Sequence, residues 1–360
     1  MARIVILGAG MMGTAFAWPL SDRGHDVRLV GTHLDDEIVA RILRDGAHPK
    51  LGLPVPERVT AFRVEELGVA MQDADAVALG VSSAGVVWAA RQLAPYARAD
   101  LPIAMITKGL GWDGRELRPL PDLVTDELPE AVRGRVAPVA VAGPCIAGEL
   151  ARRVPTAVVF TSRDAAAAEG WAALARGAYY HVWTSSDLVA VEVCAALKNA
   201  YAMGIAFAQG IHAARGGEPS SIALHNYESA VFAQAVWEMR ILIAALGANP
   251  DEASWLPGVG DLDVTCNGGR TGRFGHLLGS GLSPAQAVER MQGATLECLE
   301  ILATLRAALE AFAERGVLPR GALPLADHLA AVALDGAAVD MPFTRFFDPH
   351  LASSTRKRSE

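Results

Sequence analysis

The sequence predicts an α/β protein, with a doubly wound sheet in its first half and an all-helical domain in its second half. Short apolar runs alternate with helical segments up to about residue 183, and long segments rich in alanine, leucine and glutamate follow. The length of 360 residues fits two domains of roughly 100–200 residues each. We therefore expect one domain over residues 1–183, a second over 184–345, and a polar tail at 346–360.

Strands are expected at six nearly continuous apolar runs, and a further strand is possible at Tyr180–Trp183. Apolar strands that alternate with helices are typical of a parallel sheet covered on both faces. The six runs are Arg3–Leu7, Val27–Val30, Ala76–Val81, Ile103–Ile106, Ala137–Ala142 and Thr156–Phe160.

The second half shows helical patterns and no strand signal. Its expected helices are Asp187–Gln209, Tyr227–Leu246, Pro284–Met291, Thr295–Arg315 and Leu325–Leu334. The first of them is apolar enough to raise the question of a membrane span. However, it contains Glu192, Lys198, Asn199 and Gln209, whose polar groups are costly in hydrocarbon. We interpret it as the buried helix of a soluble domain.

Composition narrows the classes of partner. The formal net charge of -8 disfavours binding to nucleic acid or to an anionic membrane, although a small anion can still bind a local cluster of cations. The four cysteines form no CxxC pair and have no zinc-type spacing, which favours a reducing cytoplasm and predicts no metal site. The apolar start is short and ends in a glycine pattern, so we do not interpret it as a signal peptide.

That glycine pattern is the first functional signal. Gly8, Gly10 and Gly13 form G-x-G-x-x-G directly after an apolar strand, and a helix is expected to begin near Met12. The three glycines permit a tight turn, close approach of a pyrophosphate and close helix–strand packing. Free N–H groups at the start of the helix can then hold the diphosphate. The pattern predicts a Rossmann dinucleotide site.

The residues after the second strand leave the choice of cofactor open. An NAD-selective site usually places an acid at the end of this strand to bind the ribose 2′-hydroxyl. Here Thr32 and His33 come first, and the acids Asp35 and Asp36 follow late enough to be helix N-caps instead. His33 could face a 2′-phosphate or simply be solvated. NAD and NADP both remain candidates.

Lys198 is unusual because it lies in an otherwise apolar helical segment, with Asn199 beside it. A buried lysine is rare unless it is paired or functional. Reduction of a ketone needs a proton donor, and oxidation of an alcohol needs a base, and a lysine in an apolar site can serve as both. The alternatives are a lysine that extends to solvent or one that pairs with Glu192.

Two further segments carry candidate residues. Asp261 lies between glycines in GVGDLDVTC, where it could cap a turn or orient the lysine, and Thr265 follows one helical turn later. Arg270 lies in NGGRTGRFG, and glycine-rich backbone with arginine makes a good phosphate site. Arg273 is a weaker second candidate. The alternative is a mobile loop with solvated arginines.

The order of these motifs resembles a known family. GAGMMG, HPKLGLPVPERV, TKGL, GPCIAGE, ALKNAYAMGIAFAQG and GVGDLDVTC together look like the NAD(P)-dependent glycerol-3-phosphate dehydrogenases, from Arg3 to about Leu299. The resemblance implies interconversion of glycerol 3-phosphate and dihydroxyacetone phosphate by hydride transfer. It implies a cytoplasmic enzyme of glycerol phosphate and phospholipid metabolism, with a small phosphorylated substrate.

The resemblance also assigns roles to residues. Lys198 would be the catalytic lysine, supported by Lys108 and Asp261. The substrate would contact Lys108, Gly143, Asn199, Thr265, Arg270 and Thr271. The cofactor would contact Gly8, Gly10, Met11, Met12, Gly13, His33, Lys108, Ala147, Arg270 and Gln292.

Several positions depart from the family pattern. Thr271 replaces an asparagine, Cys145 a serine and Ile146 an aromatic residue, while Glu228 and Gln234 stand where basic residues are usual. Three alternatives therefore stay open: a paralogue for another phosphorylated ketone or sugar phosphate, a non-catalytic NAD(P)-binding regulator, and a dehydrogenase of hydroxy acids. The helical half could also supply the surface of a homodimer.

Overall fold

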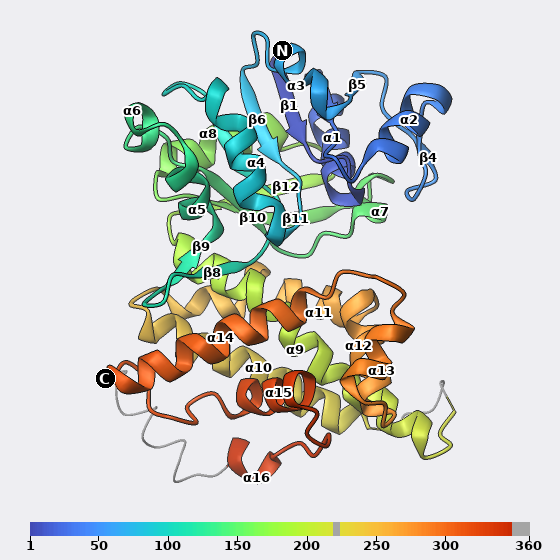
Figure 1. Ribbon diagram of the computed structural model, residues 1–360, viewed down its shortest axis with the longest axis vertical. Coiled ribbons are helices and arrows are strands. Elements are labelled where there is room, and N and C mark those ends of the chain that lie inside the picture. The colour runs from blue at the N-terminus through green and yellow to red at the C-terminus, as the bar shows by residue number, and fades with distance from the viewer. Residues whose placement is uncertain (219–223, 348–360) are drawn as a thin grey trace. The chain divides into compact units, whose positions relative to one another are not determined.

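A computed structural model describes residues 1–218 and 224–347 of the chain. It divides into two compact units, shown in Figure 1. The first comprises Met1–Gly109 and Arg118–Glu192, and the second comprises Leu110–Leu117 and the chain from Val193 onward. The hairpin strands β8 (Leu110–Trp112) and β9 (Leu117–Pro119) thus begin in the helical unit, a division that no sequence pattern indicated.

The first unit is built on an eight-stranded sheet in the order β12-β11-β10-β7-β6-β1-β2-β5. Later strands are added outward from β1 on both sides, with β2 and β5 on one side and β6, β7 and β10 on the other. This reversal of direction at β1 is typical of a doubly wound fold. The strands are β1 (Arg3–Leu7), β2 (Asp26–Val30), β5 (Val59–Phe62), β6 (Ala76–Leu79), β7 (Ile103–Met105), β10 (Val139–Ala142), β11 (Thr156–Thr161) and β12 (Tyr180–Ser185). The predicted fold class is confirmed.

Helices cover both faces of this sheet. Ile4 and Ile6 of β1 belong to one apolar cluster, while Val5 and Leu7 belong to another on the opposite face. The first cluster includes residues of α1 (Met11–Asp22), α2 (Asp36–Asp45), α7 (Ala147–Leu150) and α8 (Ala165–Ala175). The second includes α3 (Leu67–Ala70), α4 (Val86–Leu93) and α5 (Leu120–Glu127). Burial on both faces explains why these strands are continuously apolar.

The sheet is not wholly parallel, which corrects the prediction. β11 runs antiparallel to β10, whereas the other neighbouring strands are parallel. A parallel connection needs a long crossover, usually through a full helix. The link from β10 to β11 contains only the four-residue α7, so the chain returns in the opposite direction. The edge strand β5 and the small β3 (Ala47–His48) and β4 (Leu53–Pro54) pair were not predicted.

The second unit is helical. Its central helix α9 (Leu188–Ala214) is long and apolar enough to cross a membrane. However, 89% of its apolar 18-residue stretch is buried inside the protein. Its other helices are α10 (His225–Ala245), α11 (Asp261–Cys266), α12 (Arg270–Gly279), α13 (Pro284–Arg290), α14 (Glu297–Glu314), α15 (Pro324–Asp335) and α16 (Phe343–Phe346). The helices predicted from periodicity agree with α9, α10, α13, α14 and α15 within a few residues.

Glycines bring α12 against α9. A Cβ atom on Gly275 would lie 2.2 Å from the carbonyl oxygen of Met203, and one on Gly279 would lie 2.3 Å from that of Phe207. These glycines are one helical turn apart, so the two backbones touch along one face. This contact fixes the start of α12 relative to α9, the helix that carries Lys198.

Candidate active site

The glycine turn after β1 has the geometry that a dinucleotide site requires. Gly8 has a φ of +120°, and a Cβ there would lie 2.5 Å from the carbonyl oxygen of Gly80. A Cβ on Gly13 would lie 2.2 Å from the oxygen of Gly8. In contrast, a Cβ on Gly10, which precedes α1, would meet nothing within 4 Å. The first and third glycines are therefore needed for packing, and the second leaves open space at the helix start, which fits a bound diphosphate.

Lys108 lies near Gly143 because their strands are neighbours in the sheet. Ala104 of β7 pairs with Val139 of β10, so the loops that follow these parallel strands emerge at one edge. The Nζ of Lys108 donates a hydrogen bond of 3.1 Å to the carbonyl oxygen of Gly143. Gly143 has a φ of +114°, which favours glycine at this turn. The structure thus brings together two predicted residues at the edge of the sheet where ligands of this fold usually bind.

Lys198 and Asp261 form a buried ion pair in the second unit. The Nζ of Lys198 donates a hydrogen bond to Oδ1 of Asp261, although the residues are 63 positions apart. Lys198 is 9% exposed and Asp261 is fully buried. Opposite charges in contact stabilise the charged form of each group. The pair therefore stabilises an ammonium that can donate a proton, and it replaces the considered pairing of Lys198 with Glu192.

A tight turn sets Asp261 in place. The π-helical turn η5 (Leu256–Gly260) precedes α11, and Asp261 is the first residue of that helix. A Cβ on Gly258 would lie 2.0 Å from the carbonyl oxygen of Ala253, so only glycine fits. Thr265 is half-buried one turn later, and its hydroxyl donates to the carbonyl oxygen of Asp261 at 2.6 Å. Gly258 of GVGDLDVTC therefore helps to position the Asp261 carboxylate.

The start of α12 carries Arg270, where the sequence suggested a loop. Arg270 is the first helical residue, and its Nη2 lies 2.7 Å from Oε1 of Glu297 at the start of α14. About half of the arginine side chain is exposed, so the guanidinium remains accessible to a ligand. Glu297 is a site neighbour that sequence reasoning missed, because nothing in GATLECLE identifies it as a partner of an arginine. Arg273 is exposed on the same helix.

Cys266 lies close enough to the lysine–aspartate pair to experience the charges of Lys198, Asp263 and Glu228. Burial raises the pKa of its thiol to about 12, and the neighbouring carboxylates add to that effect. The thiol is therefore protonated at neutral pH and cannot act as a nucleophile. Asn199 is half-buried beside Lys198 on α9.

Glu192 is a fully buried carboxyl on the first turns of α9. Burial raises its pKa to about 8, although the charge of Lys108 opposes that effect. Glu192 is therefore protonated at neutral pH.

The departure at Gln234 has a structural role in the second unit. Gln234 is buried in α10, and its amide donates a hydrogen bond of 2.8 Å to Oε1 of Glu238. Glu238 also accepts from the N–H groups of Leu325 and Ala326 at the start of α15, and from the hydroxyl of Tyr201 on α9. This network joins three helices.

The other departures are less informative. Thr271 is buried, and its hydroxyl faces the thiol of Cys298. Glu228 contacts the ring of His225 at 3.0 Å. Cys145 is half-buried and Ile146 is 42% exposed. Nothing in the structure explains why these two residues replace the usual ones.

Most of the remaining predicted cofactor contacts are exposed or half-buried, whereas Ala147 is buried. Met11 is 42% exposed, Met12 is half-buried and His33 is exposed against the edge of the Trp88 ring. Ala147 begins α7. Gln292 is exposed in a turn after α13, with a φ of +51°.

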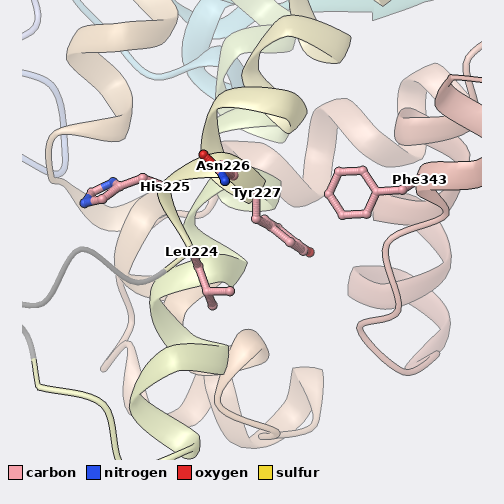
Figure 2. A pocket seen from close by; sticks show the side chains of 5 residues that line it. All are labelled: Leu224, His225, Asn226, Tyr227 and Phe343. Atoms are coloured by element: carbon pink, nitrogen blue, oxygen red, sulfur yellow. The ribbon is translucent and has the colours of Figure 1, made fainter.

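A hollow of about 560 Å³ lies elsewhere in the second unit, and Figure 2 shows the side chains that line it. It is lined by Leu224, His225, Asn226, Tyr227 and Phe343, and the rings of the last two meet edge-on at 5.0 Å. None of the predicted site residues lines it. The candidate chemistry therefore lies outside this hollow.

A doubly wound sheet with an open glycine turn, and an ammonium held by a carboxylate in a helical unit, define a class of protein. This class comprises the NAD(P)-dependent oxidoreductases that act on a CH–OH group. The chain belongs to the NAD-dependent glycerol-3-phosphate dehydrogenase family, as the motifs indicated. The family's N-terminal domain matches residues 3–168, and its C-terminal domain matches residues 187–343.

Relatives agree with this assignment. An NADP(+)-dependent glycerol-3-phosphate dehydrogenase of Archaeoglobus fulgidus is 37% identical over 289 residues, covering 80% of this chain and 83% of the relative. A glycerol-3-phosphate dehydrogenase [NAD(P)+] of Shouchella clausii is 31% identical over 296 residues, covering 81% and 82%. The crystal structure of glycerol-3-phosphate dehydrogenase from Coxiella burnetii superposes with a TM-score of 0.78 at 25% identity, covering 96% and 98%.

Proposed function

We propose that this chain interconverts sn-glycerol 3-phosphate and dihydroxyacetone phosphate, using Lys198 as the group that exchanges a proton with the substrate oxygen. The observation that carries this proposal is the buried ion pair between Lys198 and Asp261. A regulator that only binds a cofactor has no need to bury a lysine against a carboxylate, because desolvation of both charges is costly.

The nicotinamide cofactor, when bound, supplies or accepts the hydride. In the reduction direction, the ammonium of Lys198 donates a proton to the oxygen that gains charge as the carbonyl carbon is reduced. Asp261 holds the ammonium in place and balances its charge. In the oxidation direction, the amine left by that transfer accepts the hydroxyl proton, and the carboxylate stabilises the ammonium that forms.

The binding roles are assigned to residues of each unit. Arg270 would bind the substrate phosphate, because its guanidinium is accessible and can donate two parallel hydrogen bonds. Asn199 and Thr265 would contact the substrate hydroxyl groups, and Lys108 with Gly143 would form a polar contact at the sheet edge. Loss of Glu297 as a partner would accompany binding of phosphate by Arg270.

The test is an assay of oxidation of reduced cofactor with a panel of ketones. We expect turnover of dihydroxyacetone phosphate and little turnover of dihydroxyacetone, because the latter lacks the group that Arg270 would bind. Turnover of simple 2-keto acids, without turnover of the phosphorylated ketone, would refute the proposal.

A second candidate is a paralogue that reduces another phosphorylated ketone or sugar phosphate. Glu228 supports it, because this acid stands where the family usually has a basic residue and its charge reaches Cys266, near the lysine. A carboxylate there could bind an extra hydroxyl group of a longer substrate. Higher kcat/KM for a longer phosphorylated ketone than for dihydroxyacetone phosphate would favour this candidate.

Cofactor preference, location and assembly complete the proposal. The Archaeoglobus relative is named as NADP(+)-dependent, which supports use of NADP alongside NAD. A cytoplasmic location stays a prediction from the cysteine pattern of the sequence. A homodimer is also a prediction, and sedimentation of the purified chain would test it.

A further inference from the structure

The peptide groups of Ala9, in the centre of the glycine turn, are held by side chains from three elements. The N–H of Ala9 donates to Oδ2 of Asp35 at 3.2 Å, directly before α2. Its carbonyl oxygen accepts from Oγ1 of Thr14 on α1 at 3.0 Å and contacts Nε2 of His48 on β3 at 3.1 Å. Ala9, Thr14 and His48 are all fully buried.

The hydrogen bonds of His48 define which ring nitrogen carries the proton. Its Nδ1 accepts from the backbone N–H groups of Lys50 and Leu51, at 3.2 and 3.1 Å. Because Nδ1 is an acceptor, Nε2 carries the proton in the neutral ring and donates it to Ala9. The HPKLG segment therefore folds back to fix the glycine turn.

Asp35 uses its carboxylate in the same way. Oδ2 accepts not only from Ala9 but also from the N–H and hydroxyl of Thr32, at 2.9 and 2.8 Å. Asp35 is the first acid after β2, the region where this fold usually places the carboxylate that binds the ribose 2′-hydroxyl. Here Asp35 is only 9% exposed, and its carboxylate is turned toward the loop.

We propose that Asp35, His48 and Thr14 are positioning residues that hold the Ala9–Gly10 backbone for the cofactor diphosphate, and that Asp35 does not select the ribose. This inference rests on the cofactor use proposed above. NADH and NADPH share the diphosphate and differ only at the 2′ position of the ribose. Loss of the contacts that hold the turn should therefore weaken the binding of both cofactors by the same factor.

The test is to measure the affinity of the Asp35→Ala variant for NADH and for NADPH separately, by titration of cofactor fluorescence without substrate. We expect the Kd of each cofactor to rise on the order of tenfold, so that the ratio of the two Kd values stays unchanged. Asp35→Asn, which keeps one acceptor oxygen, should recover most of the affinity. Glu37→Ala is the matched control, because this acid is exposed on the first turn of α2.

Two results would overturn the inference. One is loss of NADH affinity with NADPH unchanged or tighter, which would mean that Asp35 reads the ribose. The other is unchanged affinity for both cofactors. Because no substrate is present, neither result depends on whether dihydroxyacetone phosphate is turned over.

Thr14→Val provides a milder variant if Asp35→Ala does not fold. It removes one donor to Ala9 and keeps the side-chain shape. We expect a smaller loss, equal for both cofactors, with a higher KM for cofactor and an unchanged KM for dihydroxyacetone phosphate. If Thr14 had a purely structural role, Thr14→Val would lower Tm and leave both KM values unchanged. That outcome would also contradict the inference.

Discussion

The glycine turn of the first unit and the lysine–aspartate pair of the second are built from different parts of the chain. The turn is made of backbone within six consecutive residues, Gly8 to Gly13, and its first and third glycines are needed for close packing. The pair joins two side chains 63 positions apart and depends on how helices pack. A local site can be recognised from spacing, whereas the pairing of residues in a site made by packing appears only in three dimensions.

The largest effect on stability is expected when the lysine–aspartate pair loses one of its two charges. Asp261→Ala leaves the ammonium of Lys198 buried without this carboxylate, which should lower the free energy of unfolding by about 3–5 kcal/mol. Urea denaturation measures the loss. The double variant with Lys198→Met should be more stable than Asp261→Ala alone, and additive losses would mean that the two side chains do not interact.

Matched glycine substitutions compare the two regions directly. Gly275→Ala forces a Cβ against the backbone of α9 and should cost about 1–3 kcal/mol of stability. Gly10→Ala meets nothing within 4 Å and has an ordinary φ of -62°, so stability should change by less than about 0.5 kcal/mol. Gly10→Ala should instead weaken cofactor binding. Equal Tm values for the two variants would contradict the comparison.

Arg270→Ala should affect binding more than folding. Its ion pair with Glu297 is half-exposed, and such pairs contribute at most about 1 kcal/mol to stability. If Arg270 binds phosphate, KM for dihydroxyacetone phosphate should rise by about 10–100-fold, because a hydrogen bond to a charged group contributes about 1.5–3 kcal/mol. Steady-state kinetics measures this rise. An unchanged KM would exclude Arg270 from the phosphate site.

Buried carboxyls and a buried histidine should make the stability respond to pH in opposite directions. Burial raises the pKa of Glu238 in the second unit from 4.5 to about 7. The folded state then keeps a proton that the unfolded chain loses, so stability should fall by roughly 1.4 kcal/mol per pH unit at most as pH rises from 4.5 to 7. Glu192, in the first unit, adds to this fall up to about pH 8.

His48 in the first unit acts the other way. Burial lowers its pKa below 6.5, so the unfolded chain binds the extra proton and stability is lost as pH falls below 6.5. Urea midpoints between pH 5 and 8 measure both trends. Glu238→Gln should flatten the fall between pH 5 and 7, and an unchanged profile would show that Glu238 does not titrate there.

Sequence patterns were sufficient for the parts of the fold that depend on local periodicity. The apolar runs located β1, β2, β6, β7, β10 and β11, and the long helices of the second unit were also found. The antiparallel step at β11 was missed because strand direction depends on the length and contents of a connection. The helices α11 and α12 were missed because their glycines suggested loops, although Gly275 and Gly279 serve helix packing.

The candidate site divides in the same way. Lys198 was conspicuous because it interrupts an apolar helix, yet its partner could have been Glu192 or Asp261 from sequence alone. Asp35 was weighed as a ribose ligand or helix cap, and its contact with Ala9 appears only in three dimensions. Glu297 and Glu238 gave no signal, because an acid in a helix is usually at the surface.

The central claim is that Lys198 exchanges a proton with the substrate oxygen. The most direct measurement is the single-turnover rate of NADPH oxidation by dihydroxyacetone phosphate in the Lys198→Met variant, with cofactor binding measured in parallel. We predict a rate lower by about 10²–10⁴-fold with unchanged NADPH affinity. A rate equal to that of the unmodified protein would contradict the account.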